Sequence, residues 1–272
     1  MLSRFTSTFF SLGNTLPCHR LAHSAHGGLF QPTITQAIRL LSRGPFTAPT
    51  APIPPSIDPS TPDISDPFTS AALTYSTNGI DTFPAPSAYA SRRHAWIHIF
   101  PEGKIHQRSD KAMRYFKWGV SRLILESEPA PDLVPIWIDG LDQVMHESRE
   151  WPRFIPRAGK NVGITFGEKV DMESAFGDLR ERWRDLKEKV GARSGKDDVG
   201  ILTDEELMYG AEAVALRKEC TLRVRKEVLK VRRLTGMPDE DPKESLVETW
   251  REEGKTGKRE GQMEDGSWVK DT

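Results

Sequence analysis

The sequence predicts an α/β protein, and three observations carry this prediction. Residues 95–100 and 133–138 are short runs rich in aromatic and β-branched side chains, and turn residues end each run. An apolar pattern at helical spacing covers 111–127, between the two runs. Strand, helix and strand in this order form a βαβ unit, so we expect parallel strands joined by a right-handed crossover. A third strand is expected over 162–166.

Helical patterns flank this unit on both sides. A short helix is expected from Pro32, with Gly44-Pro45 as its stop. Near the carboxyl end, a capping box of Thr203 and Glu206 is expected to start a helix that runs to about Leu234. Before that helix, one apolar helical face is formed by Phe176, Leu179, Trp183, Leu186 and Val190.

The overall composition argues against several classes of protein. With 38 Lys+Arg against 39 Asp+Glu, the chain has almost no net charge, which disfavours a dedicated nucleic-acid binder. No uncharged apolar run approaches the roughly 20 residues that a membrane-spanning helix needs, so we expect no such helix. Cys18 and Cys220 lie too far apart to indicate a disulfide framework or a zinc site, and no metal is expected.

Changes in composition divide the chain into segments. Residues 44–91 hold ten of the 20 prolines and no Lys, Arg or Glu, which predicts a long, irregular surface insertion. The end of the chain is charged and poor in apolar residues, which predicts disorder. The expected segments are therefore an amino-terminal part, the insertion, a core, carboxyl-terminal helices and a disordered tail, over 1–43, 44–91, 92–170, 171–236 and 237–272.

The first residues of the chain are basic. No Asp or Glu precedes Asp58, while the first segment carries arginines and many Ser and Thr residues. This composition is typical of a mitochondrial transit peptide. A basic start to a folded domain is the alternative interpretation.

The best candidate site is the turn Phe100-Pro101-Glu102-Gly103-Lys104, which follows the first expected strand. Ligands bind at the carboxyl ends of strands in open α/β sheets. Gly103 allows a close backbone approach, and free N–H groups in such a turn can hold an anion such as phosphate. Glu102 can accept a hydrogen bond from a hydroxyl, and positive charge is expected from Lys104, Arg114 and Lys117. Taken alone, a turn of this composition is more often plain chain geometry.

Two longer blocks give the turn a context. Residues 95–104 and 113–126 resemble the tafazzin branch of the glycerolipid acyltransferases. Val134-Pro135-Ile136 and 162–167 resemble the blocks that follow in that family. Upstream, Gly27-Gly28-Leu29-Phe30-Gln31 is similar to another of its blocks. The insertion, the last helices and the charged tail resemble fungal members, so the resemblance covers about residues 8–250.

The resemblance implies a glycerolipid-acyltransferase-like layered sheet with helices. It also implies a mitochondrial phospholipid–lysophospholipid transacylase that remodels acyl chains, above all those of cardiolipin, without a cofactor or metal. Its partners would be phospholipids, lysophospholipids and a membrane surface, with the protein held peripherally and facing the intermembrane space. The implied substrate-binding residues are Phe100, Pro101, Glu102, Gly103, Lys104, Gly28 and Phe30.

The catalytic motif of the family is not found in this sequence. The family's base is the His of a His-x4-Asp motif, in which the Asp orients the ring. None of the seven histidines is followed by Asp five positions later. The sequence thus resembles a tafazzin whose amino-terminal catalytic segment is missing, and no catalytic residue is assigned. Under this interpretation Met1 is an internal methionine and the acid-free start is a lipid-facing interior segment.

Two functions and two membrane anchors stay open. The chain is either a transacylase without its first segment or a non-catalytic phospholipid-binding peripheral membrane protein. The 111–127 helix, apolar on more than one side and carrying Arg114, Lys117 and Arg122, could lie in the membrane interface. If it is buried instead, residues 5–12 are the expected anchor. The basic half of the last helix either contacts anionic lipid or forms a solvated face.

Overall fold

The computed structural model describes the carboxyl-terminal two thirds of the chain in most detail. It covers residues 18, 27–42, 96–105, 107, 111–146, 155–191 and 200–247, and the backbone of four short strands. Those strands form two isolated antiparallel pairs, β1 (Thr74–Ser76) with β2 (Thr82–Pro84) and β5 (Glu260–Gln262) with β6 (Trp268–Lys270). The other elements are α2 (Pro32–Leu41), α3 (Gly119–Glu126), β3 (Ile136–Asp139), α4 (Leu141–Val144), β4 (Gly163–Phe166), α5 (Met172–Lys189), α6 (Glu205–Tyr209), α7 (Ala211–Leu234) and the 3-10 helix η2 (Pro242–Ser245).

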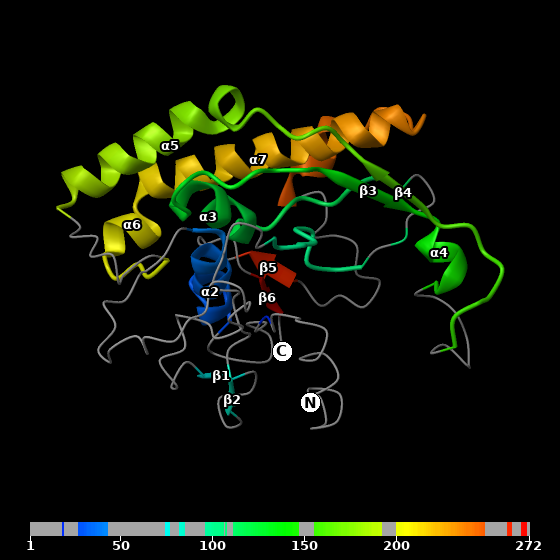
Figure 1. The fold of residues 1–272 in the computed structure, drawn as a ribbon, viewed down its shortest axis with the longest axis horizontal. Helices are drawn as coiled ribbons and strands as arrows, with labels where there is room; N and C mark the ends of the chain where they lie inside the picture. The colour runs from blue at the N-terminus through cyan, green and yellow to red at the C-terminus, as the bar shows by residue number, and fades with distance from the viewer. Residues whose placement is uncertain are drawn as a thin grey trace, which may run out of the picture.

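The helices pack in layers around one main core. Figure 1 shows α5 and α7 side by side along one side of the molecule, with α3 and then α2 below them. The β3–β4 pair and α4 extend outward at the end opposite α6 (Figure 1). Helices combined with small sheets are compatible with the predicted α/β class, whereas a larger layered sheet stays a prediction.

The α5–α7 pair follows directly from the apolar pattern of the sequence. Asp171 caps α5, its side chain accepting a hydrogen bond from the amide of Ser174. The predicted apolar face is confirmed, since Phe176, Leu179 and Trp183 are fully buried. Across from this face, α7 contributes Leu216, Cys220 and Val224 to the same core.

The expected single helix after Thr203 is two helices with a different cap. The side chain of Asp204, not that of Thr203, accepts hydrogen bonds from the first turn of α6. Gly210 has ψ 147° and separates α6 from α7. The break is stabilised by Arg217, whose guanidinium donates to the carbonyls of Leu207 and Met208.

The predicted parallel βαβ unit is wrong. Residues 96–100 form no strand, and β3 pairs antiparallel with β4, with Ile136 opposite Phe166 and Ile138 opposite Ile164. A strand needs a partner for its backbone groups, and no pairing of 96–100 occurs within the described residues. The third expected strand is confirmed as β4.

The helix expected over 111–127 starts only at Gly119. Residues 111–117 are irregular although five of them are buried, and Lys111 has a φ of 51°. Every residue from Val120 to Glu126 is buried, so the interfacial location proposed for this helix is also wrong. The alternative anchor, residues 5–12, lies outside the described residues. Among the helices of the described part, none has an apolar stretch suited to crossing a bilayer.

Two further expectations concern the ends of the chain. Within the tail for which the sequence predicts disorder, 237–272, the structure has η2, and the Glu240 side chain is buried against α7. At the other end α2 is confirmed, while its expected stop at Gly44-Pro45 and nearly all of the insertion 44–91 lie outside the described residues. The segment boundaries therefore stay predictions.

Candidate functional site

The turn predicted as the site is present and tightly constrained. The amide of Gly103 donates to the carbonyl of Phe100 at 3.1 Å, and Gly103 has a φ of +64°. Pro101 accepts a hydrogen bond of 2.8 Å from the amide of Lys117. A Cβ on Gly103 would lie 2.8 Å from Cε of Lys117, a flexible side-chain end that can shift, so it is the positive φ that favours glycine here.

Glu102 joins the turn to the buried segment behind it. Its Oε2 accepts a hydrogen bond of 2.9 Å from the backbone amide of Arg114. A charged acceptor on a buried amide is a strong interaction, so Glu102 positions this segment. A role for Glu102 in binding a lipid hydroxyl stays a prediction.

The positive charge expected around the turn is only partly available. The side chain of Arg114 is buried, with its guanidinium 5.8 Å from the ring centre of Tyr115. Lys104 is exposed and Lys117 packs over Gly103. Phe100 is 66% exposed and its ring lies 4.6 Å from that of His98. The turn thus presents an aromatic ring and a lysine at the surface.

The irregular segment behind the turn is held by side chains of α7 and the tail. Arg225 donates to the carbonyls of Met113 and Arg114 at 2.7 and 3.1 Å, and Arg232 donates to that of Lys111 at 3.3 Å. Glu240 accepts from the amide of Met113 at 2.6 Å. These partners satisfy buried backbone groups that a helix would otherwise pair internally. We call Arg225, Arg232 and Glu240 the arginine clamp.

The clamp is itself an ion-pair network with almost no exposure to solvent. Arg225 and Glu240 are 2.6 Å apart, with side chains 5% and 3% exposed. Arg232 lies 3.3 Å from the other oxygen of Glu240. Its guanidinium also lies 5.6 Å from the ring centre of Trp137 in β3. The clamp therefore connects α7, the site segment, the tail and the sheet.

The upstream candidates Gly28 and Phe30 lie on a loop attached to α3. Gly28 has a φ of 104°, and its carbonyl accepts from the Gln31 side chain at 2.8 Å. The ring of Phe30 lies 5.2 Å from the guanidinium of Arg122 and 5.2 Å from that of Arg217. Arg122 is also paired with Glu126 at 2.6 Å, with side chains 1% and 5% exposed.

The structure brings the two groups of predicted site residues to one stretch of chain. The turn contacts this stretch through Arg114 and Lys117, and the upstream loop contacts it through Arg122, which also donates to the carbonyl of Leu29 at 3.1 Å. Residues 111–126 thus form the shared support of both groups. This confirms neither group as substrate-binding, but it shows that they share a support.

Sequence reasoning missed the role of the buried arginines. The sequence places Arg217, Arg225 and Arg232 in the basic half of the last helix, for which contact with lipid or with solvent is the expectation. All three are buried. Their spacing of eight and seven residues puts them on one face of a helix, and this periodicity was the available signal.

Other reactive groups in the described part give no sign of catalysis. Cys220 is fully buried, and burial raises the pKa of its thiol well above the usual range, so it stays protonated. No cluster of three His, Cys, Asp or Glu side chains suited to a metal ion occurs among the described residues. The candidate site therefore consists of the turn 100–104 and the segment that supports it.

Comparison with known proteins gives related sequences, although no family model matches the chain. The chain is 29% identical to the tafazzin of Saccharomyces cerevisiae over 257 residues, which is 92% of this chain and 60% of the yeast protein. It is 36% identical to the tafazzin of Drosophila melanogaster over 87 residues, or 32% of the chain and 22% of the fly protein.

A plant enzyme matches a shorter part. The N-acylphosphatidylethanolamine synthase of Arabidopsis thaliana is 33% identical over 81 residues, which is 29% of this chain and 28% of the plant protein. The chain thus spans about three fifths of the length of yeast tafazzin and a smaller share of the other two relatives. The resemblance found in the sequence blocks is confirmed, and the tafazzins of yeast and fly are homologues of this chain.

Proposed function

We propose that this chain supplies the lipid-binding part of a phospholipid–lysophospholipid transacylase that remodels the acyl chains of cardiolipin. The observation that supports this most is the similarity to yeast tafazzin over 92% of the chain. The plant relative is named for an acyl transfer to a phospholipid, which supports the same class of substrate. We further propose a peripheral location on mitochondrial membranes, facing the intermembrane space.

The geometry of the turn supports lipid binding near its surface. Gly103 adopts a positive φ, which holds the turn in a fixed shape with Phe100 and Lys104 at the surface. Lys104 is exposed beside it and can attract a phosphate. Phe100, 66% exposed, can contact an acyl chain or glycerol. The proposed role of this surface is to position the phosphate and glycerol of the lysophospholipid.

The proposal assigns lipid binding, and not proton transfer, to these 272 residues. No histidine among them is followed by Asp in the family's spacing. General acid–base catalysis contributes about 10²–10⁴ in rate, so we expect no acyl transfer by the 272-residue chain alone. Transfer from cardiolipin to a lysophospholipid above background by this purified chain would contradict the assignment.

A chimaera tests the function itself. This chain would replace the matching segment of yeast tafazzin, and the chimaera would be expressed in yeast that lacks tafazzin. We expect cardiolipin remodelling to be restored, measured by the acyl composition of cardiolipin. A chimaera that folds and binds vesicles but transfers no acyl chain would support the alternative, a non-catalytic phospholipid-binding protein.

A matched pair of glycine substitutions makes the test specific for the turn. Gly103→Ala in the chimaera introduces a Cβ at a positive φ and against Lys117, so we expect acyl transfer to fall at least tenfold, about 1.4 kcal/mol. Gly191→Ala has a similar φ of +68° but nothing within 4 Å of the added Cβ. Equal activity of the two variants would show that the turn has no role in binding.

A further inference from the structure

The β3–β4 pair has one face that does not contact the core. Residues opposite each other in a sheet, and residues two apart along a strand, share a face. Ile136 pairs with Phe166 and Ile138 with Ile164, so these four side chains share one face. We call it the outer ribbon face. The opposite face carries Trp137, which pairs with Thr165.

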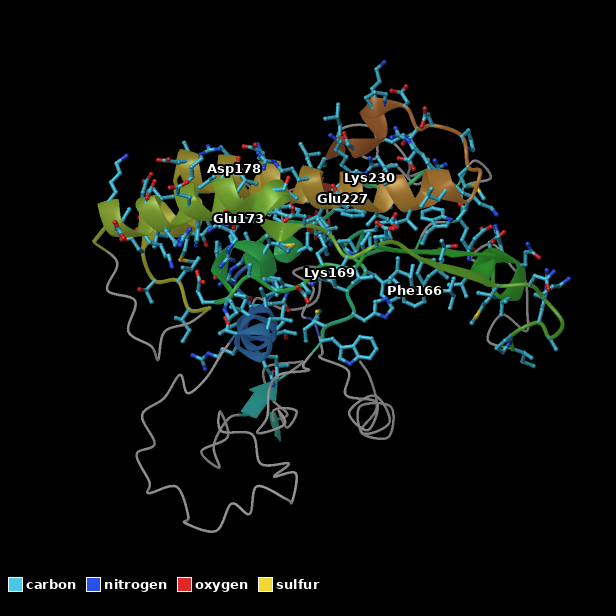
Figure 2. The ribbon with its side chains drawn as sticks, turned by 45° about the horizontal axis from the view of Figure 1, so that its top comes forward. Phe166, Lys169, Glu173, Asp178, Glu227 and Lys230 are labelled. Carbon is cyan, nitrogen blue, oxygen red and sulfur yellow. The ribbon has the colours of Figure 1, made fainter. Side chains whose placement is uncertain are left out.

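Contacts with α7 identify which face is turned inward. Trp137 packs against the main core and lies 5.6 Å from the guanidinium of Arg232. At the end of β4, a Cβ on Gly167 would collide with Val231 of α7. The outer ribbon face is therefore directed away from α7. Figure 2 agrees, since Phe166 lies on the side of the ribbon away from Glu227 and Lys230 of α7.

The side chains on the outer ribbon face are apolar, although the exposed face of a sheet normally carries polar ones. A sheet with one face in water normally alternates apolar and polar side chains. Here Phe166 is 64% exposed and Ile164 is 56% exposed. Further exposed apolar side chains flank the same strands at Val134, Leu141, Met145, Ile155 and Val162. Several exposed apolar side chains on one sheet face are the kind of surface at which proteins bind partners.

The charges beside this face indicate the kind of partner. Arg157 and Lys160 are exposed, and neither forms an ion pair with another described residue. No Asp or Glu occurs over 155–167. Over the whole stretch 136–166 four acidic residues balance four basic ones, so the excess of positive charge is confined to the segment 155–167.

The position of the ribbon suits a large, flat partner. The β3–β4 pair runs beside the carboxyl-terminal end of α7, and α4 lies beyond that end of the molecule (Figure 1). Apolar side chains next to unpaired cations are the combination that binds the interface of an anionic bilayer, where the apolar groups enter the headgroup region and the cations meet phosphates. A protein partner would not require the excess of positive charge.

From these observations we infer that the outer ribbon face, with Arg157 and Lys160, docks the protein on anionic phospholipid bilayers. The choice of a lipid partner rests on the proposed function. The inference replaces the 111–127 helix as the membrane contact, because α3 is buried. It concerns binding alone and requires no acyl transfer.

Vesicle binding tests the inference with the 272-residue chain. The probes are vesicles of phosphatidylcholine alone and of phosphatidylcholine with about one third phosphatidylglycerol, and bound protein is measured by co-sedimentation. The double variant Arg157→Gln/Lys160→Gln removes two charges worth about 1 kcal/mol each, so we expect roughly 30-fold weaker binding to the anionic vesicles. The double variant Ile164→Ser/Phe166→Ser is expected to weaken binding at least tenfold, by about 1.4 kcal/mol.

Matched controls lie on α7 and at the end of α5. Leu222 and Leu234 are 50% and 78% exposed, and Leu222→Ser/Leu234→Ser should leave vesicle binding unchanged. Lys226→Gln/Lys189→Gln removes two exposed charges away from the ribbon and should change binding less than twofold. Circular dichroism and thermal unfolding establish that each variant is folded, which is expected because Ile164 and Phe166 are more than half exposed.

Three results would overturn the inference. One is unchanged vesicle binding by both ribbon variants. Another is equal weakening by the control variants. The third is a dimer, detected by light scattering, that the ribbon variants dissociate while vesicle binding persists, because the face would then contact a second copy. A chimaera without transacylase activity, but with ribbon-dependent vesicle binding, would refute the proposed function and leave the docking surface intact.

Discussion

Residues 111–117 and the adjoining α3 have similar apolar patterns, yet only α3 is a helix. Both are buried: Met113 is 2% exposed and Ile124 is 3% exposed. The difference lies in where their backbone groups find partners. In α3 the partners are internal, whereas in 111–117 they come from Glu102, from Pro101 and from the arginine clamp.

The comparison shows that burial and conformation are decided separately. An apolar pattern determines that a segment is buried, and the available hydrogen-bond partners determine its conformation. Around the candidate site, the partners supplied by the arginine clamp lie more than a hundred positions away in sequence. The irregular backbone in turn fixes the turn that carries Glu102 and Gly103.

The largest effect is expected from breaking the clamp. Glu240→Ala leaves Arg225 and Arg232 buried without their acid, and breaking a buried pair costs about 3–5 kcal/mol. Stability is measured by denaturant unfolding, and local order by amide exchange. We expect amides of 112–114 to exchange faster in the variant, while those of α3 change less.

Ile124→Ala is the control for that experiment. It creates a cavity in α3 and costs about 2–5 kcal/mol without removing a partner of 111–117. Exchange should then rise throughout the core and not selectively at 112–114. If both variants gave the same exchange pattern, the same interactions would stabilise both segments. That result would contradict the claim that the arginine clamp holds residues 111–117 separately from α3.

A smaller effect is expected from Glu102→Gln. This change keeps the size of the side chain but replaces a charged acceptor on the Arg114 amide by a neutral one. Hydrogen bonds to charged groups contribute about 1.5–3 kcal/mol and neutral ones about 1, so we expect a loss of roughly 1 kcal/mol. Lys104→Gln, an exposed change in the same turn, should leave unfolding unchanged. A loss as large as that of Glu240→Ala would mean that Glu102, not the clamp, holds the segment.

The smallest effect is expected at the surface between α5 and α7. A hydrogen bond from Arg223 holds the pKa of Asp178 below its ordinary value of 3.8. The folded pKa is lower than the unfolded one, so this stabilisation is present above pH 3.8 and is lost as the pH falls through the folded pKa. The pair is largely exposed, so Asp178→Asn should cost less than about 1 kcal/mol at neutral pH and less still in high salt.

Unfolding curves at several pH values check this prediction. The difference between wild type and Asp178→Asn should shrink as the solution becomes strongly acidic. Asp185→Asn removes an exposed carboxylate of α5 that forms no ion pair with a described residue, and it should show no such trend. Figure 2 shows Asp178 on α5, alongside α7. If the difference in unfolding free energy between wild type and Asp178→Asn did not depend on pH, the ion pair with Arg223 would not be its cause.

Much of the site was predictable because its signals are local. The turn 100–103 follows from a proline and a glycine in sequence, and the positive φ of Gly103 agrees with it. The function of Glu102 in the fold was not predictable, because its partner amide belongs to a segment expected to be helical. The predicted N-cap of α6, Thr203, was wrong for another reason. Thr203 and Asp204 are both good capping residues, and only the backbone geometry decides which of them caps the helix.

The sequence by itself determined the elements that have a clear local pattern: α2, the apolar face of α5, β4 and the turn. Tertiary structure alone decided the irregular path of 111–117, the antiparallel pairing of β3 with β4 and the burial of three arginines of α7. The physical reason is the distance along the chain between interacting groups. Residue propensity and hydrophobic periodicity depend only on residues that are close in sequence. A hydrogen bond from an arginine to a buried carbonyl more than a hundred residues away leaves no such local pattern.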